Sequence, residues 1–112
     1  MSLAIRFQAE PIRSLAFGSI SGTYMGIGAA LSNPGRQFII SNFTDVELFF
    51  SFDGVDDHIV LAANTSFVND ISSNQTFNQG WFLAEGTRIY VKDTGSAASS
   101  GNVYISIFYG KI

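Results

Sequence analysis

The sequence predicts an all-β protein, a two-sheet antiparallel β-sandwich with a jelly-roll-like arrangement. Apolar and polar residues alternate with a period of two in several segments, and turn-forming Gly, Asn, Asp and Pro residues separate these segments. No segment keeps an apolar period of 3.6 residues over three helical turns. Strands that bury one face each need an opposing apolar layer, which favours two packed sheets.

The expected strands follow this alternation along the chain. In the first, Leu3, Ile5 and Phe7 share one parity, and Pro11 suits a strand boundary because it cannot donate a ladder hydrogen bond. This strand either belongs to the sandwich or forms an assembly arm over residues 1–11. In order, we expect strands at residues 3–7, 12–17, 24–27, 37–43, 46–52, 58–61, 65–68, 80–83, 87–92 and 102–109.

The same alternation assigns strand faces, because successive side chains of a strand point to opposite sides of the sheet. One set shares the expected inner faces: Val46, Leu48, Phe50, Phe52, Ile89, Val91, Val103, Ile105, Ile107 and Tyr109. The opposite faces carry Glu47, Phe49, Ser51, Arg88, Tyr90, Lys92, Tyr104, Ser106 and Phe108.

Composition limits the function classes. The 112 residues suit a single domain over 1–112, and 46% apolar content argues against disorder. Charged residues make up 13% of the chain, about half the usual share, which suits an assembly subunit better than a freely diffusing enzyme. A net charge of −3 with scattered basic residues disfavours nucleic acid as a partner.

The chain has no cysteine, which removes disulfides, thiol nucleophiles and cysteine metal sites. No stretch approaches the ~20 apolar residues of a membrane span, so we expect no membrane partner. Arg6, Glu10 and Pro11 interrupt the region where a secretion signal needs an apolar run. We therefore expect synthesis in a cytoplasm.

Four segments resemble small β-sandwich structural proteins of tailed-bacteriophage virions. They are ISNFTDV (residues 40–46), SFDGVDDH (51–58), FLAEGTRIYVK (82–92) and SGNVYIS (100–106). These motifs are turn-and-strand signatures and speak to the fold more than to a chemical site. The resemblance implies a capsid decoration or cement protein, which binds the outside of an icosahedral head as a small oligomer and clamps neighbouring capsid subunits.

The acidic turn at residues 53–57 is the sharpest local motif. Asp53, Asp56 and Asp57 are a candidate Ca²⁺ site, because hard cations bind several oxygen ligands around a tight turn. Gly54 comes too early for an EF-hand loop, and Asp-Gly is a strong two-residue hairpin signal, so we favour a hairpin turn. Asp56 and His58 share one face of an extended chain, but no motif marks a serine nucleophile beside them. We predict no catalytic residues and no cofactor.

Aromatic residues are more numerous than one thin core needs. They form a core, a sugar-stacking platform or a protein interface, where Tyr, Trp and Phe are enriched. We favour an interface for several of them, because they lie opposite the aliphatic faces of their strands. The candidate interface residues, including the N-terminal ones, are Leu3, Ile5, Phe7, Phe43, Phe49, Trp81, Tyr104 and Phe108.

We therefore expect a non-enzymatic virion protein, most simply a capsid decoration protein on the capsid surface. Its expected partners are itself, as a dimer or trimer, and the major capsid protein. The alternative is a carbohydrate-binding or adhesin-like module in a head fibre, neck or tail, which would bind a glycan through exposed Trp81 and tyrosines.

Overall fold

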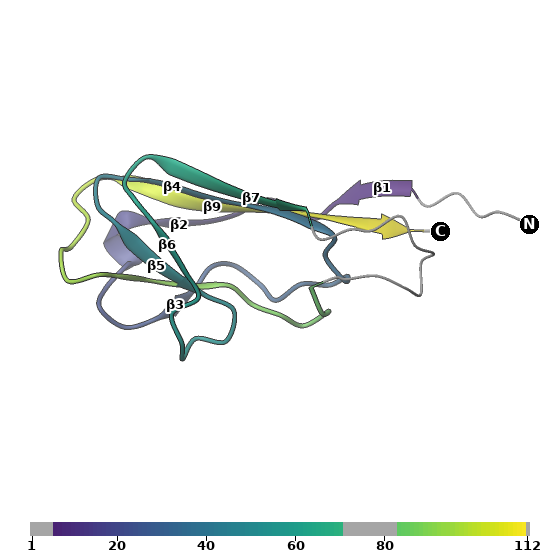
Figure 1. Cartoon of the computed structure of the whole chain (residues 1–112), viewed down its shortest axis with the longest axis horizontal. Helices are drawn as coiled ribbons and strands as arrows, with labels where there is room; N and C mark the ends of the chain where they lie inside the picture. Colours follow the sequence, from purple (N-terminus) through teal and green to yellow (C-terminus); the bar gives the residue numbers. More distant parts are fainter. Residues whose placement is uncertain (1–5, 71–82, 112) are drawn as a thin grey trace, which may run out of the picture.

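The computed structural model describes residues 6–70 and 83–111, which form two antiparallel sheets packed face to face (Figure 1). The predicted all-β sandwich is confirmed. Within the described ranges there is no α-helix, and no helix is long and apolar enough to cross a membrane. The elements are β1 (Arg6–Ala9), β2 (Arg13–Ala16), the 3-10 turn η1 (Phe17–Ser19), β3 (Met25–Gly26), β4 (Gln37–Thr44), β5 (Leu48–Ser51), β6 (Ile59–Leu61), β7 (Thr65–Asp70), β8 (Tyr90–Asp93) and β9 (Gly101–Lys111).

The strands pair in a nested order along the chain. Strands β1 and β2 pair with β9, β3 with β8, β4 with β7, and β5 with β6. Folding this long hairpin over itself produces a five-stranded sheet ordered β1-β9-β4-β7, with β2 also on β9, and a four-stranded sheet ordered β3-β8-β5-β6. This connectivity is that of a jelly roll.

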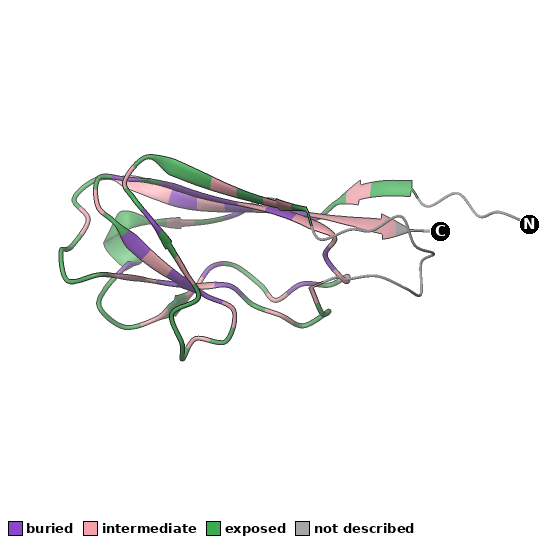
Figure 2. Ribbon diagram, viewed as in Figure 1, coloured by how far each residue is buried: buried purple, intermediate pink, exposed green. Residues whose placement is uncertain are grey.

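The core lies between the two sheets and follows the predicted alternation, except that Ser51, expected on the outer face of its strand, is fully buried. Buried side chains of β9 and β4 face those of β5 and β8, and Figure 2 shows buried positions alternating along these strands. Val46 and Phe52 are partly buried and pack against the same cluster. The buried apolar residues are Ile20, Ile27, Leu31, Phe38, Ile40, Leu48, Phe50, Leu61, Ile89, Val91, Val103, Ile105 and Ile107.

Asn42 joins the sheets where β4 turns into β5. Its side chain is fully buried and donates hydrogen bonds to the carbonyls of Val46 (2.9 Å) and Leu61 (3.1 Å). Its amide oxygen accepts from the Thr44 backbone N–H and hydroxyl at 3.0 and 2.6 Å. A buried amide is stable when its donors and acceptors are satisfied, so this residue holds the corner between the layers.

Several strand boundaries differ from the sequence prediction. Phe17 begins a 3-10 turn instead of ending a strand, and this turn directs Ile20 into the core. Residues 87–89 precede β8, because Thr87 and Ile89 make isolated backbone hydrogen bonds to the segment at 27–31 and no regular ladder. The expected strand at 80–83 lies outside the described residues apart from Leu83, which forms a bridge with Gly35.

The predicted hairpin at the acidic turn is present, but it does not close at the two residues Asp53 and Gly54. Strands β5 and β6 do pair, but the register matches Phe50 with Ile59, so residues 52–58 all belong to the connecting loop. Asp53 accepts backbone hydrogen bonds from Val55 and Asp56, and this longer loop replaces the tight turn. Gly54 has φ +76, the left-handed conformation that glycine adopts without strain.

Candidate functional site

Asp53 organises the loop between β5 and β6. Its Oδ1 accepts hydrogen bonds from the Val55 N–H at 2.8 Å, the Asp56 N–H at 3.0 Å and the Ser51 hydroxyl at 2.8 Å. These backbone and hydroxyl donors lower the pKa of Asp53 to about 2. The carboxylate is therefore ionised at neutral pH and acts as the centre of a hydrogen-bonded turn.

The loop also brings together three groups that are possible metal ligands. One ligand atom each from Asp53, Asp56 and His58 lies within 4.8 Å of the others, and all three residues are exposed. His58 Nδ1 accepts the Phe52 N–H at 3.0 Å, so in the neutral ring Nε2 carries the hydrogen and has no free lone pair. Two exposed carboxylates fall short of the six to eight oxygens that Ca²⁺ takes. The arrangement suits a structural turn better than a cation site.

Asp57, the third predicted calcium ligand, turns toward β3 and β8 instead. It accepts a hydrogen bond from the Tyr24 hydroxyl and pairs with Lys92 Nζ at 3.3 Å. The hydrogen bond from Tyr24 lowers the pKa of Asp57, while burial and then the same hydrogen bond raise the pKa of Tyr24. Both groups are thus in their ordinary charge states at neutral pH, and the contact ties the loop to the sheet.

The same loop does not form a catalytic triad. Ser51 is buried and donates to Asp53, and His58 Nε2 lies 4.0 Å from Asp53 Oδ2. A triad needs the imidazole between the nucleophile and the acid, so that it can take the hydroxyl proton. Here the carboxylate lies between serine and histidine, and this order does not activate the hydroxyl.

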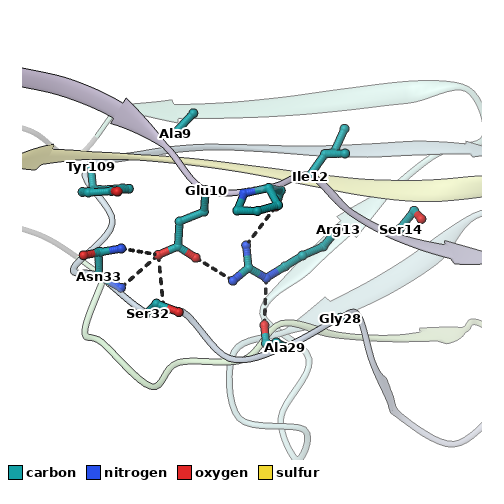
Figure 3. A pocket seen from close by; sticks show the side chains of 11 residues that line it. Ala9, Glu10, Ile12, Arg13, Ser14, Gly28, Ala29, Ser32, Asn33 and Tyr109 are labelled. Carbon is teal, nitrogen blue, oxygen red and sulfur yellow. Dashed lines mark hydrogen bonds and ion pairs between the residues drawn. The ribbon is translucent and has the colours of Figure 1, made fainter.

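A buried ion pair at the start of β2 was not predicted from the sequence. Arg13 Nη2 donates to Glu10 Oε1 at 2.6 Å, and both side chains are buried (Figure 3). Glu10 Oε2 also accepts from the backbone N–H groups of Ser32 (3.1 Å) and Asn33 (2.9 Å) and from Asn33 Nδ2 (3.1 Å). Arg13 Nε donates to the Ala29 carbonyl at 2.7 Å. The pair joins β2 to the segment at 28–33.

Electrostatics keep this pair ionised. Burial raises the pKa of Glu10, but the hydrogen bonds from Arg13 and Asn33 outweigh it, so the net pKa is lowered. In the sequence, Glu10 and Arg13 are ordinary charged residues beside an expected strand, and no local pattern indicates their burial. Their positions result from the approach of residues 28–33, which are distant in the chain.

A cavity of about 470 Å³ opens beside this pair. Figure 3 shows Glu10 and Arg13 pointing to the side opposite Ala9 and Ile12. The polar side chains that line the cavity are those of Glu10, Arg13, Ser14, Ser32, Asn33 and Tyr109. Both oxygens of Glu10 and the Nε and Nη2 groups of Arg13 already have partners within the protein. The charged groups thus hold the fold together and leave little capacity to recognise a polar ligand.

The outer face of the five-stranded sheet carries four of the predicted interface residues. Phe7 stacks on Phe108 with ring centroids 5.1 Å apart, and Phe43 contacts Tyr104 at 5.9 Å. Phe7 and Phe43 are 67% and 49% exposed. They flank a surface of small or uncharged residues: Ala9, Ser14, Ala16, Gln37, Ile39, Ser41, Ser66, Val68, Asn102 and Ser106. We call this surface, with the four aromatic residues, the neutral face.

The predicted interface set does not form one surface. Phe49 lies on the outer side of the other sheet, next to Val60 and Lys92, with Lys92 Nζ 5.8 Å from its ring centroid. Leu3, Ile5 and Trp81 lie outside the described residues. The structure therefore brings together Phe7, Phe43, Tyr104 and Phe108 and separates Phe49 from them.

Comparisons with family models, curated proteins and solved structures found no match to this chain.

Proposed function

We propose that this protein is a non-enzymatic structural subunit of a virion, a capsid decoration or cement protein that self-associates and attaches to the major capsid protein on the capsid surface. The observation that supports this most directly is the neutral face. Exposed aromatic rings on a sheet with few charges resemble the centre of a protein interface, where aromatic residues are enriched and charged residues depleted.

The contrast between the two sheets strengthens the proposal. The outer side of the four-stranded sheet carries Lys92, which forms an ion pair with Asp57 of the acidic loop at 53–57, and Arg88, which donates to the carbonyl of Gly28. Such a surface is well solvated, and covering it would require these charges to lose water. Covering the neutral face has little of this cost, so it is the better contact surface.

The chemistry of the polar clusters favours a structural role. The Asp53 loop and the Glu10–Arg13 pair use their charged groups to hold backbone segments in place. An enzyme needs a general acid, base or nucleophile aimed at a substrate position. Within residues 6–70 and 83–111 neither cluster has that geometry.

The assignment to a capsid rests on the resemblance of four turn-and-strand segments to tailed-phage virion proteins. A decoration protein works mechanically: it binds the assembled shell and not the free subunit, and so stabilises the assembled state by mass action. An uncharged contact surface suits this task because its binding depends little on ionic strength.

A glycan-binding module of a head fibre, neck or tail is the second candidate. Aromatic rings next to polar groups on the side of the molecule that carries the four-stranded sheet favour it, above all Tyr24, which donates to Asp57, and Phe49, which lies beside Lys92. However, Lys92 Nζ lies 4.7 Å from the Tyr24 ring centroid and 5.8 Å from that of Phe49. The protein's own cation thus occupies the space where a sugar would stack, which makes this candidate weaker.

Immunogold electron microscopy of virus particles released by cells that express the protein tests the proposal. Labelling on the surface of particle heads is the expected result. Labelling confined to tails or necks would favour the second candidate, which binding to a glycan array would then check. Particles without label, with the protein left in the soluble fraction, would contradict a virion function.

A further inference from the structure

We infer that the neutral face is the site of self-association, and that its occupant is a second copy of this chain packed sheet against sheet. This inference rests on the proposed assembly function and specifies which surface and which partner serve it. The alternative occupant of the same face is the capsid protein. Charge and area favour the second copy.

The distribution of charge favours a copy of the same chain. Asp70 is the sole charged residue that the described register places on the outward side of the five strands, and it lies at an edge, where it accepts a hydrogen bond from Gln37 at 3.1 Å. The chain as a whole has a net charge of −3, so two copies repel each other overall. The neutral face avoids this repulsion, and it offers no charge pattern by which a different partner would be selected.

The dimensions of the sheet suit a dimer. Strand β9 has 11 residues, which span about 37 Å at a rise of ~3.4 Å per residue. Four strand positions lie across the sheet, and at a spacing of ~4.8 Å they extend over about 19 Å. The rectangle bounded by these two lengths is about 700 Å². The other strands are shorter than β9, so the face approaches but stays below the ~800 Å² per partner of a standard interface.

The aromatic residues lie toward both ends of this face. Phe43 and Tyr104 occupy one end of the β4–β9 pair, and Phe108 and Phe7 the other, with Ile39, Ser106 and Val68 between them. In a two-fold pair the same surface meets itself, so each copy supplies both aromatic pairs to one contact. Aligned packing of two sheets needs side chains that interdigitate over a gap of ~10 Å, and small residues between bulky ones allow this.

Two exposed valines form a matched pair for the experiment. Val68 lies in the edge strand β7 on the neutral face and is 66% exposed. Val60 lies in the edge strand β6 on the outer side of the other sheet and is 51% exposed. Glutamate at either position is solvent-accessible in the monomer, so both variants should fold. A charge at position 68 would be buried in the proposed dimer, whereas a charge at position 60 would not.

Sedimentation velocity of the full chain over a concentration series is the measurement. We expect the unmodified protein and Val60→Glu to associate with the same dissociation constant, and Val68→Glu to raise that constant at least tenfold. Equal association of the two variants would overturn the inference. A protein that stays monomeric at every concentration would also overturn the inference. If the microscopy experiment still showed label on particle heads, the proposed capsid function would stand, and the neutral face would be available to the capsid protein.

Single cysteines give a second measurement that does not depend on adding a charge. The chain has no native cysteine, so Val68→Cys and Val60→Cys each carry one thiol. We expect the rate of maleimide labelling of Val68→Cys to fall severalfold as the protein concentration rises through the dissociation constant. The rate for Val60→Cys should stay constant. The opposite pattern would place self-association on the four-stranded sheet and refute the inference.

Discussion

Replacing Arg13 with methionine tests whether the Glu10–Arg13 pair holds β2 against the segment at 28–33. Methionine keeps an unbranched apolar side chain but removes the guanidinium group. Glu10 would keep the hydrogen bonds from Ser32 and Asn33 and lose the cation 2.6 Å away. The carbonyl group of Ala29 would lose its donor as well. The variant therefore leaves a buried carboxylate without its counter-charge.

The expected cost follows from the burial of the pair. Removing one partner of a buried ion pair costs about 3–5 kcal/mol, because an uncompensated charge stays out of water. Three hydrogen bonds remain on Glu10 and still stabilise its negative charge, so we expect the lower end, about 3 kcal/mol. A domain of this size has a total stability of about 5–15 kcal/mol, which makes this loss easy to measure.

Urea unfolding followed by circular dichroism at pH 7 measures the loss. Arg88→Met is the matched control, because exposed Arg88 donates to the carbonyl of Gly28 at 2.7 Å in the same region. We expect this control to cost less than about 1 kcal/mol, as for other exposed interactions. If Arg13→Met costs no more than Arg88→Met, the pair does not hold the fold and our account of it is wrong.

The pH dependence gives an independent check of the same pair. The pKa of Glu10 is lowered in the folded protein, so its ionised form contributes stability above its ordinary pKa of 4.5. That contribution is lost as the pH falls below 4.5 through the folded value. The loss of stability of Arg13→Met relative to the unmodified protein should therefore become smaller in acid, because protonated Glu10 is neutral and gains nothing from the positive charge of Arg13. A deficit that stays constant from pH 7 to pH 3 would contradict an electrostatic origin.

Three further predictions address the core, one glycine and the acidic loop. Phe50→Ala should lower the free energy of unfolding in urea by about 3–5 kcal/mol, because Phe50 is fully buried. Phe43→Ala on the neutral face should cost far less, because Phe43 is half exposed. Equal losses would mean that the strand faces are misassigned. Gly101→Ala should lower the free energy of unfolding much more than Gly86→Ala. Both glycines have positive φ, so the backbone strain of an alanine is shared. A Cβ at Gly101 would lie 2.0 Å from the carbonyl oxygen of Phe43, whereas a Cβ at Gly86 would meet nothing within 4 Å. The pKa of Asp53 is lowered from 3.8 to about 2, so its ionised form stabilises the fold above pH 4, and this contribution is lost as the pH falls toward 2. The difference in free energy of unfolding between the unmodified protein and Asp53→Asn should therefore disappear over that range. A difference that is unchanged at pH 2 would refute this role.

Local sequence was sufficient for the fold class and for much of the core. Alternation in β9 placed Val103, Ile105 and Ile107 inside, and Leu48 and Phe50 of β5 face them as predicted. The physical reason is that the two-residue period of a strand is a property of the backbone itself, so it is visible before any partner strand is known. The need to bury these apolar faces then implies a second sheet.

Tertiary structure decided which strands become neighbours, and with them the surfaces and polar clusters. Phe43 and Phe49 have the same local signature, an aromatic residue opposite an aliphatic face, yet they lie on different sheets. Glu10 and Arg13 are buried because residues 28–33 fold over them, and the Asp-Gly sequence joins a longer loop because the register pairs Phe50 with Ile59. Each outcome depends on how separate segments pair and pack, and the side-chain pattern within one segment does not specify that pairing.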